Sequence, residues 1–220
     1  MIEGVIFDMD GVLIDSHPAH RLAWRKFLGT VGKNVGDDEL GFILEGRRRE
    51  EILRHFLGDL PASKIAEYGE HKDLFFEENF GDVNLIPGVR EFLESLEAAG
   101  LKSAIATSAS STRTWGTLRR MELSQKFATI VTGDDVDDGK PDPAVYKLAS
   151  GRMNLSPEKL LVFEDAPCGV QAAKSAGMYC IGVSTNGRAE VLLQCGAEFV
   201  VPDFVNLSIE TLLDLPVAKS

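Results

Sequence analysis

From residue 82 onward, short apolar runs alternate with segments of helical spacing. The apolar runs have the length of buried strands and fall at residues 101–107, 128–131, 160–163, 179–183 and 198–201. The helical segments fall at residues 89–99, 112–121, 142–153, 169–176 and 189–195. Strict alternation of strand and helix requires right-handed crossovers and a parallel sheet with helices on both faces. We therefore expect an α/β fold.

The segment after the first strand breaks this alternation. That strand is expected at residues 4–7, yet residues 17–80 show helical patterning, interrupted by glycines and Pro61, and no convincing strand. An open parallel sheet binds its ligand at the carboxyl ends of its strands, so an insertion at this point would lie over the site. We expect an α/β core domain of residues 1–16 and 82–220, and an inserted all-helical cap domain of residues 17–81 that acts as a lid.

The composition limits the classes of partner. The 220 residues include 34 acidic and 23 basic side chains, for a net charge of −11, and this excess repels nucleic acids and anionic membranes. The three cysteines have no metal-binding spacing, and no apolar stretch approaches the ~18 residues of a membrane helix. The first residues lack the basic region of a signal peptide. We expect a cytoplasmic protein, a monomer or a weak homo-oligomer, that binds neither nucleic acid nor membrane.

Polar residues follow four strands of the expected sheet, at the edge where a ligand would bind. In chain order they are Asp8 and Asp10, Thr107 and Ser108, Lys140, and Glu164 and Asp165. Carboxylates that converge in one crevice repel one another unless a divalent cation lies between them, and oxygen ligands suit Mg²⁺. Hydroxyl groups at a loop that leads into a helix can hold phosphate oxygens. The sequence therefore predicts a magnesium site beside a phosphate site.

This set of residues suits phosphoryl transfer, in which positioning and charge neutralisation do most of the catalysis. A carboxylate can attack phosphorus and form an aspartyl-phosphate. A second carboxylate two residues further on can protonate the leaving oxygen and later activate water or an acceptor hydroxyl. A phospho-acceptor signalling domain also combines aspartates, a hydroxyl residue, a lysine and Mg²⁺, but the long separation of Asp8 from Thr107 argues against that class.

The motifs resemble those of the haloacid dehalogenase superfamily, which has a Rossmann-like core, and they occur in the same order over nearly the whole chain. They are Asp8-x-Asp10-Gly11, Thr107, Lys140-Pro141 and Glu164-Asp165. The resemblance implies that Asp8 is the nucleophile and that Asp10 is the general acid and base. Dehalogenases proper lack the second aspartate, so Asp10 indicates phosphate esters as substrates rather than alkyl halides.

The same resemblance implies roles for the other motif residues. Thr107 would hold the transferring phosphate, and Lys140 would stabilise both that phosphate and the nucleophile. The ligands of Mg²⁺ would be Asp8, Asp10 through its carbonyl group, and Asp165, with Glu164 beside them.

The sequence is most similar to the β-phosphoglucomutase-like subgroup, which carries a helical cap after the first motif. Together with Ser108, the matching substrate-binding positions are His20, Gly46, Arg49 and Lys72. In that subgroup the histidine contacts the hinge of the acid/base residue, and the arginine and lysine meet substrate phosphate or the closed-state network. The structural alternatives are a surface imidazole for His20 and ion pairing with neighbouring glutamates on a solvated helix for Arg49.

One departure bears on the reaction. The mutases carry a Ser-Lys-Asn run that grips a second phosphate, whereas residues 109–112 of this chain contain no lysine, and Arg113 would replace it only in part. A mutase must hold a bisphosphate in two orientations, but a phosphatase needs one anion site. We therefore expect a Mg²⁺-dependent phosphohydrolase of small phosphate monoesters, such as sugar phosphates. The alternative is a β-phosphoglucomutase that interconverts β-glucose 1-phosphate and glucose 6-phosphate.

Overall fold

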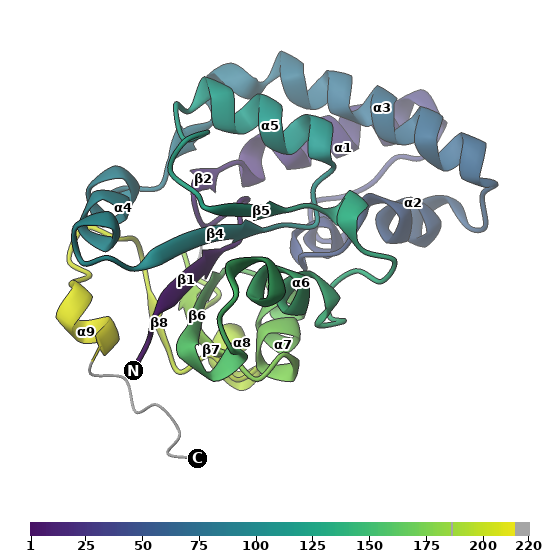
Figure 1. Ribbon diagram of the computed structural model, residues 1–220. Coiled ribbons are helices and arrows are strands. Elements are labelled where there is room, and N and C mark those ends of the chain that lie inside the picture. Colours follow the sequence, from purple (N-terminus) through teal and green to yellow (C-terminus); the bar gives the residue numbers. More distant parts are fainter. Residues whose placement is uncertain (186, 214–220) are drawn as a thin grey trace.

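The computed structural model describes residues 1–185 and 187–213 and contains a six-stranded parallel sheet with the order β5-β4-β1-β6-β7-β8 (Figure 1). The strands are β1 (Gly4–Phe7), β4 (Lys102–Ala106), β5 (Thr129–Val131), β6 (Leu160–Glu164), β7 (Tyr179–Val183) and β8 (Phe199–Val201). They agree with the predicted strands to within one residue at each end, and the predicted α/β fold with a Rossmann-like parallel sheet is confirmed.

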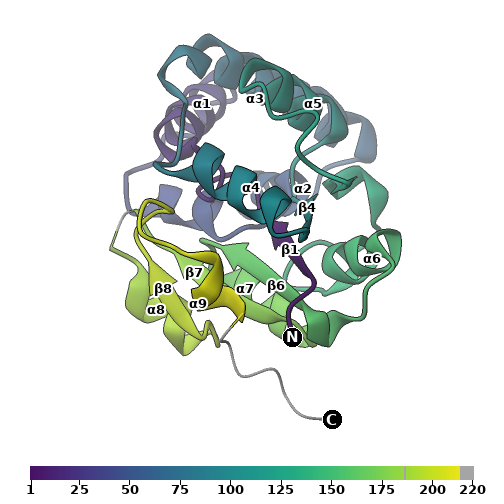
Figure 2. The same ribbon diagram turned by 60° about the vertical axis from the view of Figure 1, so that its left-hand side comes forward.

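The central strands send alternate side chains to opposite faces of the sheet. Phe7 and Phe163 pair across β1 and β6 and stack at 5.3 Å in one apolar cluster, whereas Ile6 and Val162 belong to a second cluster on the other face. The first face is covered by α4 (Val89–Ala98), α9 (Ile209–Leu213) and part of α5 (Ser111–Arg120). The second face is covered by α6 (Ala144–Met153), α7 (Pro167–Ser175) and α8 (Ala189–Gln194). Figure 2 shows α4 and α9 in front of the sheet.

A two-stranded antiparallel ribbon lies where the helical segment leaves and rejoins the core. It consists of β2 (Ile14–Asp15) and β3 (Asn84–Leu85), and Ile14 is paired with Leu85. Strands of two residues are too short to give a periodic signal, which explains why the sequence analysis predicts no strand in these segments. The ribbon brings the two ends of the helical segment together beside the end of β1.

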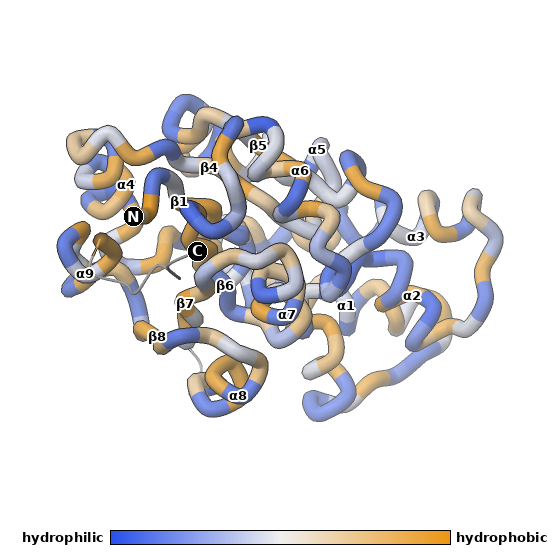
Figure 3. Tube along the Cα trace, turned by 60° about the horizontal axis from the view of Figure 1, so that its bottom comes forward, coloured by the Kyte–Doolittle hydropathy of each residue, from blue (hydrophilic) through white to orange (hydrophobic). Residues whose placement is uncertain are grey.

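The segment between β2 and β3 is helical, with α1 (His17–Thr30), a 3₁₀ helix (Glu39–Leu44), α2 (Arg49–Leu57), α3 (Ala62–Glu78) and a 3₁₀ turn (Phe80–Asp82). Its helices surround an apolar cluster of their own that includes Trp24, Phe27, Leu53 and Phe56. Figure 3 shows hydrophobic and hydrophilic residues alternating along α2 and α3, as expected for helices with one buried face. The division into a core and a cap of residues 17–81 stays a prediction, tested below.

Among the described residues, no helix combines the length and the apolar character needed to cross a membrane.

Candidate active site

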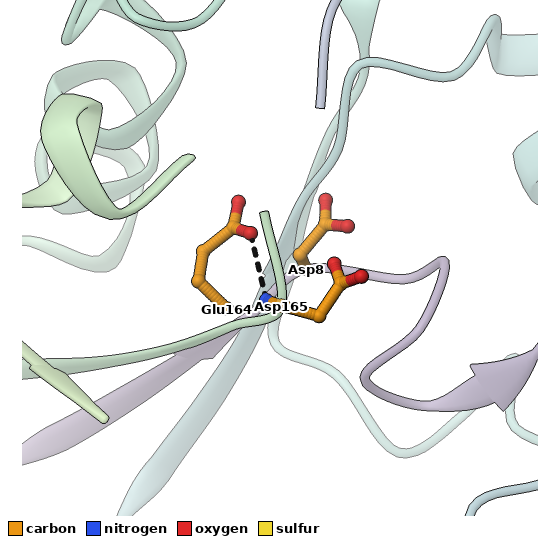
Figure 4. Close-up of side chains that lie close together, drawn as sticks. All are labelled: Asp8, Glu164 and Asp165. Atoms are coloured by element: carbon orange, nitrogen blue, oxygen red, sulfur yellow. Dashed lines mark hydrogen bonds between the residues drawn. The ribbon is translucent and has the colours of Figure 1, made fainter. Parts of the chain in front are cut away.

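Three carboxylates meet at the carboxyl ends of β1 and β6. Asp8 directly follows β1, Glu164 ends β6 and Asp165 follows it, and one oxygen atom from each lies within 4.8 Å of the others (Figure 4). The turn after β1 depends on Gly11, which has a φ of +75°. A Cβ atom at Gly11 would lie 2.3 Å from the Asp165 carboxylate, so a side chain at this position would displace the cluster.

A buried lysine joins two of these carboxylates. The Nζ atom of Lys140 donates to Asp8 Oδ1 at 2.8 Å, to Glu164 Oε1 at 2.6 Å and to the carbonyl oxygen of Ala106 at 3.2 Å. The hydroxyl group of Tyr146 donates to the same Glu164 oxygen at 2.7 Å. Lys140 and Glu164 are 1% and 0% exposed, so this network is buried. We call Asp8, Lys140, Glu164 and Asp165 the floor of the site.

The carboxylate cluster carries more negative charge than its lysine neutralises. Burial, together with the neighbouring carboxylates, raises the pKa of Asp8 to about 8 although Lys140 acts in the opposite direction. Burial also raises the pKa of Asp165. A divalent cation among these oxygens would relieve the repulsion, and hard carboxylate oxygens are the ligands that Mg²⁺ prefers. The residues therefore fit Mg²⁺, with Asp8, Glu164 and Asp165 as the side chains that could hold it.

The second carboxylate of the first motif, Asp10, has a different environment. Its Oδ1 atom accepts hydrogen bonds from Ser16 Oγ at 2.7 Å and from Arg113 Nη1 at 3.0 Å, and it lies 3.2 Å from His20 Nε2. The other guanidinium nitrogen of Arg113 donates to Asp10 Oδ2, which makes the ion pair bidentate. Burial alone would raise the pKa of Asp10, but Arg113 and His20 outweigh it and hold the pKa well below its usual range.

Two histidines on one face of α1 contact two different carboxylates of the site, Asp10 and Asp165. His20 stacks on Phe76 at 4.4 Å, and burial lowers the pKa of its imidazole to about 4. Three residues earlier, His17 Nε2 lies 2.9 Å from Asp165 Oδ2. Burial would lower the pKa of His17, but Asp165 outweighs that effect and the net pKa is raised. The helix α1 therefore faces both Asp10 and the carboxylate cluster.

The helical segment contributes two further cations, which share one carboxylate. Arg49 Nη1 lies 3.2 Å from Asp73 Oδ2, and Lys72 Nζ lies 2.7 Å from Asp73 Oδ1. Lys72 is 4% exposed, with its ammonium group 5.5 Å from the ring centroids of Trp24 and Phe76. Burial lowers the pKa of Lys72 despite the adjacent Asp73. We call Arg49, Lys72 and Asp73 the cap wall.

The hydroxyl residues that follow β4 make different contacts. Thr107 Oγ1 accepts a hydrogen bond from the backbone N–H of Ala109 at 3.2 Å, and Thr107 is 1% exposed. Ser108 Oγ donates to the carbonyl oxygen of Gly46 at 2.8 Å, which ties the helical segment to the core. Arg48 adds a second tie, because its guanidinium donates to the carbonyl oxygen of Asp137 at 2.7 Å.

A cavity of about 90 Å³ lies between the helical segment and the ends of the strands. Most of the predicted site residues line it: Asp8, Asp10, His20, Gly46, Arg49, Lys72, Thr107, Ser108 and Asp165. Lys140 and Glu164 do not line it, but Lys140 holds Asp8 from below and is itself held by Glu164. The residues that the motifs placed at separate strand ends and helices therefore share one cavity.

The structure also adds residues that the sequence analysis did not predict. They are Ser16, which contacts Asp10, His17, which contacts Asp165, Asp73 in the cap wall and Tyr146 beneath the floor. A signal existed for His17, because a spacing of three places it on the same helical face as His20. The sequence offers no such signal for Tyr146, because a tyrosine in an amphipathic helix is most simply a core residue.

Comparison with known proteins decides the family. A family model described as haloacid dehalogenase-like hydrolase matches residues 5–183. The chain belongs to this family. Among curated relatives, this haloacid dehalogenase-like hydrolase is 41% identical over 212 residues to the "Phosphorylated carbohydrates phosphatase" of Thermotoga maritima, which covers 91% of this chain and 94% of that protein. It is 31% identical over 220 residues to the "Beta-phosphoglucomutase" of Bacillus subtilis, covering 96% and 94% of the two chains.

Solved structures agree with this assignment. The hydrolase matches the crystal structure of a β-phosphoglucomutase from Clostridium difficile with a TM-score of 0.86 and 26% identity, covering 97% of this chain and 96% of that one. It matches CbbY from Rhodobacter sphaeroides, solved in complex with phosphate, with a TM-score of 0.80 and 28% identity, covering 94% and 96%. The likeness covers the helical segment as well as the sheet, because both matches span nearly the whole chain.

Proposed function

We propose that this protein is a Mg²⁺-dependent phosphohydrolase of small phosphate monoesters, sugar phosphates above all, that acts through a phosphoaspartate on Asp8. The observation that carries the proposal is the joint placement of Asp8 and Asp10 in one cavity, with Asp8 held by Lys140 beside two further carboxylates. The 41% sequence identity to a phosphatase of phosphorylated carbohydrates supports the same substrate class.

In the first step, Asp10 carries a proton; an Asp8 oxygen forms a bond to phosphorus while the ester oxygen leaves, and Asp10 donates its proton to that oxygen. In the second step, Asp10 takes a proton from water, which attacks the phosphoaspartate and releases inorganic phosphate. Lys140 orients Asp8 from below, and Thr107 and Ser108, which line the cavity, would hold the phosphate.

Asp8, Glu164, Asp165 and the Asp10 carbonyl group would hold Mg²⁺, which when bound supplies positive charge against the phosphoryl oxygens. Gly46, His20, Arg49 and Lys72 would bind the remainder of the substrate and exclude water. Cytoplasmic location, and a monomeric or weakly oligomeric state, remain predictions from the sequence.

The substitution Asp8→Asn tests the covalent mechanism, because it removes the nucleophile with little change in shape. We expect phosphate release from a panel of sugar phosphates in Mg²⁺ to fall by at least about 10³-fold, with an unchanged circular dichroism spectrum. The matched control is Asp59→Asn, at an exposed position of the helical segment, which should retain full turnover. Mg²⁺-dependent hydrolysis that survives in Asp8→Asn would exclude the phosphoaspartate.

A β-phosphoglucomutase is the second candidate, supported by the match to a mutase structure at a TM-score of 0.86. The two candidates differ in the acceptor, which is water in one case and a sugar hydroxyl in the other. A coupled assay that starts from β-glucose 1-phosphate with added glucose 1,6-bisphosphate separates them. Formation of glucose 6-phosphate faster than inorganic phosphate would favour the mutase, and hydrolysis without isomerisation would favour the phosphatase.

A further inference from the structure

Arg113 occupies a position that the proposed chemistry does not require. It lies in the first turn of α5, in the place where the sequence suggested a partial replacement for the lysine of the mutases. Its guanidinium is not free in the cavity, because both terminal nitrogens, Nη1 and Nη2, donate to the carboxylate of Asp10. The side chain is 9% exposed, and its guanidinium lies 5.3 Å from the ring centroid of Phe76. The proposed general acid and base, Asp10, is therefore held in a buried bidentate ion pair.

The two oxygens of Asp10 are held unequally. Ser16, His20 and one nitrogen of Arg113 reach Oδ1, whereas the other nitrogen of Arg113 holds Oδ2. If the guanidinium moved away, Oδ1 would keep its contacts with Ser16 and His20, and the carboxylate would stay in place. Oδ2 would lose its hydrogen bond to Arg113. Departure of Arg113 therefore frees one oxygen for proton exchange without loosening the side chain.

A buried guanidinium that leaves one anion requires another. The nearby acid of the cap wall, Asp73, already contacts Arg49 and Lys72. A carboxylate or phosphate group on the substrate can accept two parallel hydrogen bonds from the fork of an arginine, and a neutral hydroxyl cannot replace that charge.

We propose that Arg113 is a positioning residue that blocks Asp10 until a second anionic group on the substrate takes over its guanidinium. The inference rests on the proposed hydrolysis of phosphate monoesters, and it adds no covalent step to that reaction. It narrows the substrate class to esters whose leaving alcohol carries a carboxylate or a second phosphate. The mutase alternative is the case in which the second phosphate is the releasing group.

The test compares three esters of one carbon skeleton in the presence of Mg²⁺. Glycerol 3-phosphate carries a neutral hydroxymethyl group, 3-phosphoglycerate carries a carboxylate at the same carbon, and glycerol 1,3-bisphosphate carries a second phosphate. In the native protein we expect kcat/KM for at least one anionic ester to exceed that for glycerol 3-phosphate by about 10-fold. The reason is that only the anionic group can bind Arg113 and so make its separation from Asp10 favourable. The ester that shows the preference identifies carboxylate or phosphate as the releasing group.

Substitution of Arg113 should reverse this preference. In Arg113→Gln we expect kcat/KM to rise about 10-fold for glycerol 3-phosphate, because the block is gone, and to fall about 10-fold for the preferred anionic ester, because its partner is gone. Arg113→Lys keeps the charge but not the fork and should retain a weakened preference. Arg119→Gln, an exposed arginine on the same helix, is the matched control and should leave all three values unchanged.

A second measurement does not depend on turnover or on a stable Arg113 variant. In Asp8→Asn, ¹⁵N NMR should show the Arg113 guanidinium signals shifting on addition of the preferred anionic ester but not of glycerol 3-phosphate. A common decrease for all three esters in Arg113→Gln, or guanidinium signals that respond to neither ester, would overturn the inference. Native protein that hydrolyses none of a broad panel of phosphate esters would instead overturn the proposed function.

Discussion

The floor and the cap wall of the cavity carry opposite excesses of charge. On the floor, Lys140 lies between Asp8 and Glu164, with Asp165 beside them, so carboxylates outnumber cations. In the wall, Asp73 lies between Arg49 and Lys72, so cations outnumber carboxylates. A surplus of carboxylates suits a divalent metal, and a surplus of cations suits an anionic substrate. The difference shows how a chain with a net charge of −11 can bind a phosphate ester.

The two regions also differ in how their side chains are positioned. The floor residues follow neighbouring strands whose register pairs Phe7 with Phe163, so hydrogen bonds of the sheet fix their separation. The wall residues come from α2 and α3, whose separation depends on how helices pack around Phe27 and Leu53. We expect the floor to be the more rigid region, and the following experiments test that difference.

The largest effect is expected from removal of the floor cation. Lys140→Met leaves Asp8 and Glu164 as buried neighbouring carboxylates, and we expect the free energy of unfolding to fall by about 3–5 kcal/mol and turnover to be lost. Urea denaturation and phosphate release measure the two effects. Lys147→Met, at an exposed position of α6, should change neither. Normal stability of Lys140→Met would mean that the floor does not depend on this ion pair.

A substitution that creates a cavity in the helical segment should destabilise that segment and leave the sheet intact. Phe27 is fully buried among the apolar residues of that segment, and Phe27→Ala should cost about 3 kcal/mol of local stability. Hydrogen exchange should show lost protection in α1 to α3 and retained protection in β1, β4 and β6. Phe163→Ala, in the sheet, should lower protection in both regions. Equal loss of protection in β1 upon Phe27→Ala would contradict the division of the chain at residues 17–81.

The third experiment concerns pH and the contact between α1 and Asp10, and its effect near neutral pH is the smallest of the three. The pKa of His20 is about 4 in the folded protein and near 6.5 in the unfolded chain, so the unfolded chain binds the proton first as the pH falls. Stability from the neutral imidazole is complete above pH 6.5 and is lost between pH 6.5 and 4, by up to about 3 kcal/mol. Relative to His20→Gln, native unfolding free energies should therefore decline in this window. Parallel pH curves for the two proteins would show that His20 does not titrate in this way.

The polar residues that follow the strands were the part of the site that could be predicted from sequence. Asp8 and Asp165 directly follow β1 and β6, Lys140 lies in the loop after β5, and parallel strands bring such positions to one edge of a sheet. The contacts of Arg113 could not be predicted, because α5 meets α1 and the end of β1 only in the folded protein. The same holds for Tyr146, whose hydroxyl reaches Glu164 although its position on α6 is that of a core residue.

The sequence by itself determined the parallel sheet, the helical segment after the first strand, and the motif residues that the cavity brings together. These features can be predicted because each apolar run and each motif can be recognised from a short stretch of the sequence. Only the tertiary structure decided which charges pair across the chain: Arg113 with Asp10, His17 with Asp165, and Arg49 with Asp73. Ion pairs between residues far apart in the chain depend on how the helices pack on the sheet, and that packing is a property of the whole fold.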